Sequence, residues 1–214
     1  MRRAPLAPAL VKELRKDFRD RIRMVQSVDD MVARVLSTLT DAEKRNTYVV
    51  FTSDNGFHLG QHRLVRGKST AHDHEVRVPP LVKRPTAGRH GYLVTGAIAQ
   101  HVDLFATFLD MAEDGADRAR QAQPGRAGRA GPGRRAPSGG DSQPPSYAEV
   151  RTAGELYVVY EGEARPEYYD TVANPNQESN DPGNARTSDL GRVLDAPAGC
   201  GKPGAPDCWT AARL

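Results

Sequence analysis

Residues 47–56 read TYVVFTSDNG, and this stretch decides the fold class. Its first six residues are β-branched or aromatic, and such a short, almost unbroken apolar run is typical of a strand buried on both faces of a parallel sheet. Residues 11–39 carry apolar side chains every three or four positions, which predicts one long amphipathic helix. Residues 41–46, DAEKRN, are expected to form the connecting loop. A helix followed by such a strand indicates an α/β protein with a doubly wound sheet.

The composition of the 214-residue chain limits its partners and divides it into parts. A net charge of +3 gives no reason to expect a nucleic-acid partner, and no apolar run approaches the ~18 residues of a membrane span. Residues 115–146 lack every large apolar side chain and are rich in Arg, Gly and Pro, which predicts a disordered linker. We therefore expect a domain over residues 1–114, the linker, and a small C-terminal subdomain with a flexible tail over residues 147–214.

Hard oxygen donors stand where the predicted strand ends. Asp54 offers a carboxylate and Asn55 an amide carbonyl, and both suit Ca²⁺ or Mg²⁺ better than zinc. Ligand sites of doubly wound sheets lie at the carboxyl ends of the strands. Asn-Gly is also a common turn dipeptide, so these residues alone leave both a metal site and a plain turn open.

The residues that follow carry a resemblance to a known family. Residues 52–64 read TSDNGFHLGQHRL, and residues 68–82 read KSTAHDHEVRVPPLV. In order and spacing they resemble the sulfatase family, in particular its glucosamine-sulfatase-like and heparan-type branches. The resemblance extends to residues 21–39, 100–110 and 147–180. It implies part of the doubly wound sheet of the sulfatase and alkaline-phosphatase-like fold, followed by a small C-terminal antiparallel sheet.

The resemblance also implies a function. A sulfatase is a sulfuric ester hydrolase with one bound divalent cation, usually Ca²⁺, and its substrate here would be a sulfated small molecule or glycan. On that pattern Asp54 and Asn55 are metal ligands, Lys68 contacts the sulfate or the leaving oxygen, and His58 donates to the substrate. Preset positive charge would stabilise the oxygens that gain charge in the transition state. Family members are commonly secreted, periplasmic or lysosomal, although this sequence shows no signal-peptide pattern.

The sequence departs from the family at the nucleophile. Sulfatases use a formylglycine made from the Cys or Ser of a C/S-x-P/A-x-R motif, and no Cys or Ser of this chain lies in such a motif. We therefore expect a C-terminal portion of a sulfatase, with little or no activity alone. His72 stands where this branch usually has Tyr, which puts the substrate contacts near it in question.

Two other functions stay open at this level. The first is a phosphoesterase or phosphonate hydrolase of the same superfamily, which would use similar metal ligands. The second is a non-catalytic role in which the Arg-rich tract of residues 115–146 binds RNA through charge alone, because no aromatic residue interleaves its arginines. The register of Lys68 favours sulfate. The sequence gives no indication of the oligomeric state.

Histidines and cysteines leave two further questions. Four histidines fall within seventeen positions: His58, His62, His72 and His74. A zinc cluster is one interpretation, but no His-Glu-x-x-His pattern occurs and Gly60 argues against a helix carrying the first two, so the oxygen-donor site is favoured. Cys200 and Cys208 are expected to form either a small disulfide loop, as related sequences often do, or two free thiols.

Overall fold

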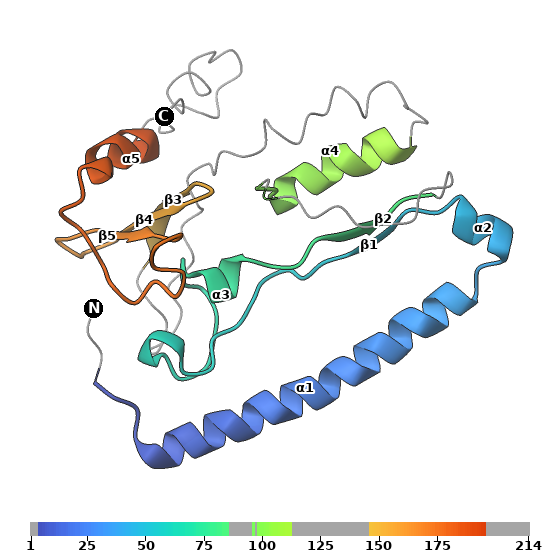
Figure 1. The fold of residues 1–214 in the computed structure, drawn as a ribbon, viewed down its shortest axis with the longest axis horizontal. Coiled ribbons are helices and arrows are strands. Elements are labelled where there is room, and N and C mark those ends of the chain that lie inside the picture. The colour runs from blue at the N-terminus through green and yellow to red at the C-terminus, as the bar shows by residue number, and fades with distance from the viewer. Residues whose placement is uncertain (1–3, 86–95, 97, 113–145, 196–214) are drawn as a thin grey trace. The chain divides into compact units, whose positions relative to one another are not determined.

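The computed structural model describes residues 4–85, 96, 98–112 and 146–195, in two compact units, Met1–Leu93 and Val94–Leu214 (Figure 1). Most of the predicted linker and both cysteines lie outside the described residues, so the expectations about them stay predictions. Among the described helices, none has the length and the apolar character needed to cross a membrane.

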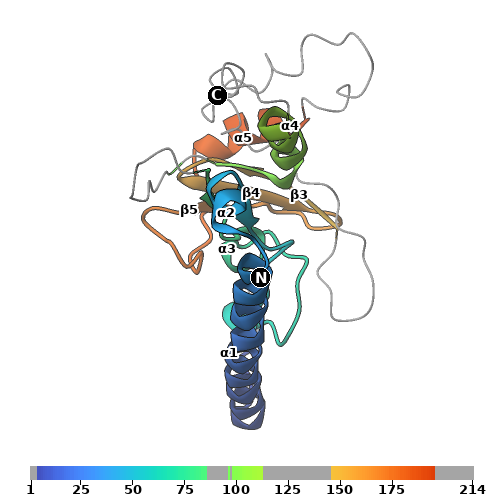
Figure 2. The same ribbon diagram turned by 90° about the vertical axis from the view of Figure 1, so that its right-hand side faces the viewer.

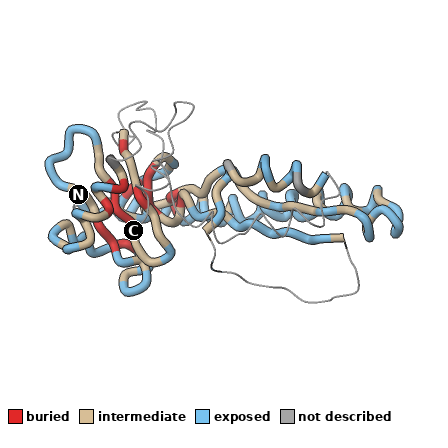
Figure 3. Tube along the Cα trace, turned by 90° about the horizontal axis from the view of Figure 1, so that it is seen from above, coloured by how far each residue is buried: buried red, intermediate tan, exposed pale blue. Residues whose placement is uncertain are grey.

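The first unit begins with α1 (Pro8–Ser37), a continuous helix that confirms the predicted periodicity (Figures 1 and 2). A proline in its first turn suits a helix start, because that position needs no backbone donor. Leu14 is buried, whereas Phe18 and Val25 keep 57% and 63% of their surface exposed. Figure 3 colours the trace by burial, and the red, buried stretches make up only a small part of it. The apolar stripe therefore forms a helix as predicted, but most of its side chains remain exposed among the residues that the structure describes.

A short helix, α2 (Asp41–Arg45), occupies the segment expected to be a loop. The reason is a capping box: Glu43 N donates to Thr40 Oγ1 over 3.3 Å, and Thr40 N donates to Glu43 Oε2 over 2.7 Å. These bonds satisfy two backbone donors that a helix start otherwise leaves open. The loop prediction was therefore wrong, although the Thr-x-x-Glu signature was present in the sequence.

The predicted strand is present as β1 (Val49–Phe51), but its surroundings differ from expectation. It pairs antiparallel with β2 (Leu81–Lys83), so that Val50 lies opposite Val82. Phe51 is 40% exposed rather than buried on both faces. An apolar run indicates a strand that other parts of the protein can bury. It does not predict the direction of the neighbouring strand, which here is formed by residues thirty positions away. The chain keeps its α/β class, since an antiparallel strand commonly joins mixed sheets.

The second unit holds α4 (His101–Ala112) and the predicted small antiparallel sheet. The sheet has the order β3-β4-β5, with β3 (Tyr147–Arg151), β4 (Glu155–Tyr160) and β5 (Glu167–Asp170). Helix α5 (Arg186–Asp195) packs against β3 and β4. The apolar core of this unit consists of Val150, Tyr157, Tyr168, Leu190 and Val193.

A polar clamp joins α5 to β4 beside that core. Arg186 Nε donates to Glu155 Oε1 over 2.9 Å, and its Nη2 donates to Oε2 over 3.2 Å. Such a paired contact is more specific than a single ion pair. The hydrogen bonds and charge of Arg186 lower the pKa of Glu155 despite partial burial, which opposes them.

Candidate functional site

The candidate site lies on the loop that leaves β1 and returns through α3 (Asp73–Val76). The two ends of this loop meet at Gly56, whose amide donates to Glu75 O over 2.6 Å, while Phe57 N donates to His74 O over 3.1 Å. A Cβ on Gly56 would lie 2.0 Å from His74 O, so only glycine permits this approach. Gly56 therefore closes the loop.

Asp54, Asn55 and Lys68 lie together on this loop. Lys68 Nζ donates to Asn55 Oδ1 over 3.0 Å and lies 3.9 Å from Asp54 Oδ2. The Asn55 amide is oriented by its own Nδ2, which donates to Gly56 O over 2.7 Å and so turns Oδ1 toward the lysine. The structure thus brings three of the four predicted site residues together, from positions up to fourteen apart in sequence.

The backbone around Lys68 is held in an uncommon conformation. Ser69, which follows it directly, has a φ of 87°. A left-handed conformation costs free energy for any residue other than glycine, and such residues cluster at functional sites where the surroundings impose them. The position of Lys68 is therefore set by the folded loop rather than by local preference.

The donor set of Asp54 and Asn55 fits one side of a hard-cation site. Both offer oxygen, and the Asp54 side chain keeps 82% of its surface exposed, so a cation can reach it. Ca²⁺ takes six to eight oxygen ligands, so two residues supply only part of a coordination shell. The Lys68 ammonium adds a positive charge suited to an anion bound beside that cation.

His58, the fourth predicted residue, is buried and faces a different group. Its Nδ1 lies 2.6 Å from Glu75 Oε1, and its backbone pairs with Gly67 through two hydrogen bonds of 2.9 and 3.3 Å. Gly67 has a φ of 149°, and a Cβ there would come within 3.1 Å of the His58 ring. These contacts fix the strand-like segment that leads directly into Lys68.

Glu75 is the central residue of the loop, and the sequence placed it in the acidic stretch of the family pattern without predicting a role for it. It is 2% exposed, and Thr70 donates to it twice, from the backbone N to Oε2 over 2.6 Å and from Oγ1 to Oε1. Burial alone would raise the pKa of Glu75, but its contacts with His58, His74 and Thr70 outweigh burial and hold the pKa well below its usual range. Its position before Arg77-Val78-Pro79 was the available signal, yet nothing in the sequence showed that the carboxylate points inward.

The remaining histidines form a stack beside this carboxylate. The rings of His62 and His72 lie 3.7 Å apart and nearly parallel, and the rings of His62 and His74 lie 5.3 Å apart. Burial and the nearby His74 lower the pKa of His62 to about 4. The His62 imidazole is therefore expected to be uncharged at neutral pH.

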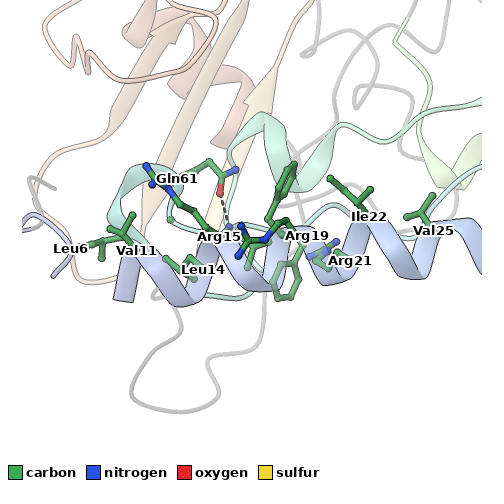
Figure 4. A pocket seen from close by; sticks show the side chains of 13 residues that line it. Leu6, Val11, Leu14, Arg15, Arg19, Arg21, Ile22, Val25 and Gln61 are labelled. Carbon is green, nitrogen blue, oxygen red and sulfur yellow. Dashed lines mark hydrogen bonds between the residues drawn. The ribbon is translucent and has the colours of Figure 1, made fainter. Parts of the chain in front are cut away.

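An open apolar groove of about 720 Å³ lies between α1 and the first part of the loop (Figure 4). Leu14, Phe18 and Ile22 line it from the helix, and Phe57 and Leu59 line it from the loop. The Arg21 guanidinium lies 4.4 Å from the centre of the Phe57 ring. The residues that line the groove do not include Asp54, Asn55 or Lys68.

Comparisons with known proteins show which family the chain resembles. The chain is similar to the Drosophila melanogaster protein named extracellular sulfatase SULF-1 homolog, with 47% identity over 92 residues, which are 42% of this chain and 8% of that protein. It is similar to the Capra hircus N-acetylglucosamine-6-sulfatase, with 32% identity over 119 residues, which are 55% of this chain and 21% of that protein. The chain therefore spans about a fifth or less of the length of these relatives.

A solved structure of a protein in complex with its substrate D-glucosamine-2-N,6-O-disulfate is similar in fold. Its TM-score is 0.67 at 25% identity, and the alignment covers 80% of this chain and 38% of that one. The family model described as Sulfatase matches residues 7–114, which include α1, β1 and the whole candidate loop. The chain belongs to the sulfatase family.

Proposed function

We propose that this chain supplies part of the divalent-cation and sulfate-binding site of a sulfuric ester hydrolase. Asp54 and Asn55 bind the cation, expected to be Ca²⁺ or else Mg²⁺, and Lys68 contacts an oxygen of the sulfate group. The observation that carries the proposal is the convergence of the Lys68 ammonium on the oxygens of Asn55 and Asp54, at 3.0 and 3.9 Å.

The chemistry of the three residues supports these roles. Two hard oxygen donors beside an ammonium form a place where a doubly charged cation and an anion can be bound next to each other. A cation bound there would polarise the sulfate oxygens. Lys68 provides a compact charge for an oxygen that gains negative charge when the ester bond breaks.

His58 pairs with Gly67, the residue before Lys68. It was expected to donate to the substrate, and that remains a proposal. The contacts of its ring with Glu75 and of its backbone with Gly67 favour a positioning role, in which His58 holds the segment that carries Lys68. A positioning role predicts weaker ligand binding in a His58 variant, together with faster hydrogen exchange of the Gly67 amide.

A sulfated glucosamine is the proposed substrate class. The solved structure with a TM-score of 0.67 contains D-glucosamine-2-N,6-O-disulfate, and the goat relative is named for a glucosamine 6-sulfate ester. The chain alone is proposed to hydrolyse such esters little or not at all, because its sequence has no formylglycine motif. The proposed activity of this chain is therefore binding without turnover.

A calcium titration tests the cation-binding part. The purified chain is titrated with CaCl₂ while amide NMR signals of residues 53–68 are followed, and a dissociation constant of about a millimolar or weaker is expected from an incomplete ligand set. Asp54→Ala should abolish the shifts, whereas Asp41→Ala, an exposed carboxylate on α2, should leave them unchanged. Calcium-dependent shifts of equal size in the two variants would contradict the proposal.

Competition between sulfate and phosphate monoesters tests the anion. Glucosamine 6-sulfate should bind at Lys68 more tightly than glucosamine 6-phosphate when both are titrated in calcium. A preference for the phosphate would favour the phosphoesterase alternative. Turnover of an aryl sulfate at enzyme-like rates would show that the expected inactivity is wrong.

A further inference from the structure

A second cluster of metal-ligating atoms lies inside the loop. His58, His74 and Glu75 each offer one ligand atom, and these atoms all lie within 4.8 Å of one another. None of the three is among the oxygen donors proposed for Ca²⁺. Two imidazoles and one carboxylate are a ligand set that zinc uses with a fourth position open.

The distances around Glu75 Oε1 suit a tetrahedral ion. Ligands about 2.0–2.1 Å from a tetrahedral zinc lie about 3.4 Å from one another. His74 Nε2 lies 3.4 Å from Glu75 Oε1, in agreement with that spacing. His58 Nδ1 lies closer, at 2.6 Å, as a hydrogen bond requires, so this pair would open by less than about an ångström to admit the ion.

The contact of His74 with Glu75 falls short of a hydrogen bond. The His74 Nε2 is buried and has no hydrogen-bond partner among the described residues. A buried polar atom without such a partner is costly, and each one in a folded protein calls for an explanation such as a water or an ion. The His74 side chain as a whole is 20% exposed, so an ion can enter beside it.

The groups around the cluster already orient its carboxylate. Thr70 N donates to Glu75 Oε2 over 2.6 Å, which leaves Oε1 directed at the two histidines. The Thr70 hydroxyl also donates to Oε1. Metal ligands are usually held in this way by outer hydrogen bonds, whose loss typically costs 10- to 100-fold in affinity.

We propose that His58, His74 and Glu75 bind a zinc ion, with water in the fourth position. Nitrogen donors favour zinc over calcium, so this ion and the one proposed at Asp54 and Asn55 would not compete. The bound zinc ties α3 to the segment at His58, which pairs with Gly67 next to Lys68. Its expected effect is to stabilise the loop that carries the anion-binding lysine.

Cobalt spectroscopy on the full chain tests this site. The chain is stripped with a chelator and titrated with CoCl₂, and an intense visible absorption that saturates at one equivalent and is displaced by zinc is expected from a near-tetrahedral site. His74→Gln should weaken zinc binding by more than about 10-fold. Hydrogen exchange of the Phe57 and Gly56 amides shows whether this variant keeps the loop folded.

Two control variants separate this site from other zinc ligands. His101→Gln, on α4, and the double variant Cys200→Ser/Cys208→Ser should both bind zinc as the unaltered chain does. Asp54→Ala should lose calcium and keep zinc, so failure of either proposal can be recognised separately. Absence of a saturable equivalent, unchanged zinc affinity in His74→Gln, or loss of zinc in the cysteine variant would overturn the proposal.

Discussion

The two units of the molecule are stabilised by different kinds of contact. The first unit is organised around a buried carboxylate, Glu75, and it leaves most of the apolar stripe of α1 exposed. The second unit has an apolar core that includes Val150, Tyr157 and Leu190, of which Leu190 has no exposed surface. In the first unit the contacts that define the fold also position the candidate site, so stability and binding are expected to change together there. In the second unit they are expected to be separable.

The largest effect is expected at the point where the loop of the first unit closes. Gly56→Ala places a Cβ 2.0 Å from His74 O, which forces the loop apart and should cost about 3 kcal/mol or more. Hydrogen exchange of the segment 54–77 should become fast, and calcium binding should be lost with it. The matched control is Gly183→Ala, where no atom lies within 4 Å of the new Cβ and a change under about 0.5 kcal/mol is expected. Protection of the loop in Gly56→Ala equal to that in the control would contradict this account.

A core truncation in the second unit should separate stability from binding. Leu190→Ala removes a fully buried side chain and should lower the free energy of unfolding by about 2–5 kcal/mol. Urea unfolding followed by near-ultraviolet circular dichroism monitors this change through the tyrosines of β3, β4 and β5. Calcium titration should be unaltered. Val172→Ala, at a valine of the same unit that is 78% exposed, provides the control with a small expected effect. A parallel loss of calcium binding in Leu190→Ala would remove the distinction between the units.

A smaller effect with a defined pH dependence is expected at Glu155. Contact with Arg186 lowers the pKa of Glu155 from its ordinary value near 4.5, so the folded state keeps the carboxylate charged more readily than the unfolded state. The stabilisation is therefore fully present above that value and is lost as the pH falls below it. Glu155→Gln should cost about 1 kcal/mol at pH 7, since Arg186 is partly exposed, and this difference should shrink in acid. A difference that grows below pH 4.5 would contradict the assigned direction of the pKa shift.

Local sequence patterns predicted which helices and strands form, but they did not predict what those elements pack against. The spacing of apolar residues predicted α1, and the apolar run predicted β1, because both patterns report properties of one segment. The antiparallel pairing of β1 with β2 and the inward direction of Glu75 depend on contacts between segments, which no local pattern encodes. The same limit applies to His58. Its place in the motif predicted a substrate contact, which stays a prediction, and nothing in the sequence indicated that its ring contacts Glu75.

For the site itself, the oxygen pair and the lysine were recognised as single residues in a family pattern. That Lys68 Nζ reaches Asn55 Oδ1 depends on the left-handed Ser69 and on the pairing of His58 with Gly67. Both are features of the folded loop. Residue types therefore indicated the chemistry, and the loop conformation supplied the geometry.

The central claim is that Asp54, Asn55 and Lys68 act together on one cation and its bound anion. The most direct measurement is the affinity for glucosamine 6-sulfate with and without Ca²⁺, in the unaltered chain and in Lys68→Ala. Calcium should tighten binding of the sulfated sugar to the unaltered chain, and Lys68→Ala should weaken it by about 10-fold while the calcium affinity changes little. An affinity for the sulfated sugar that depends on neither calcium nor Lys68 would contradict the account.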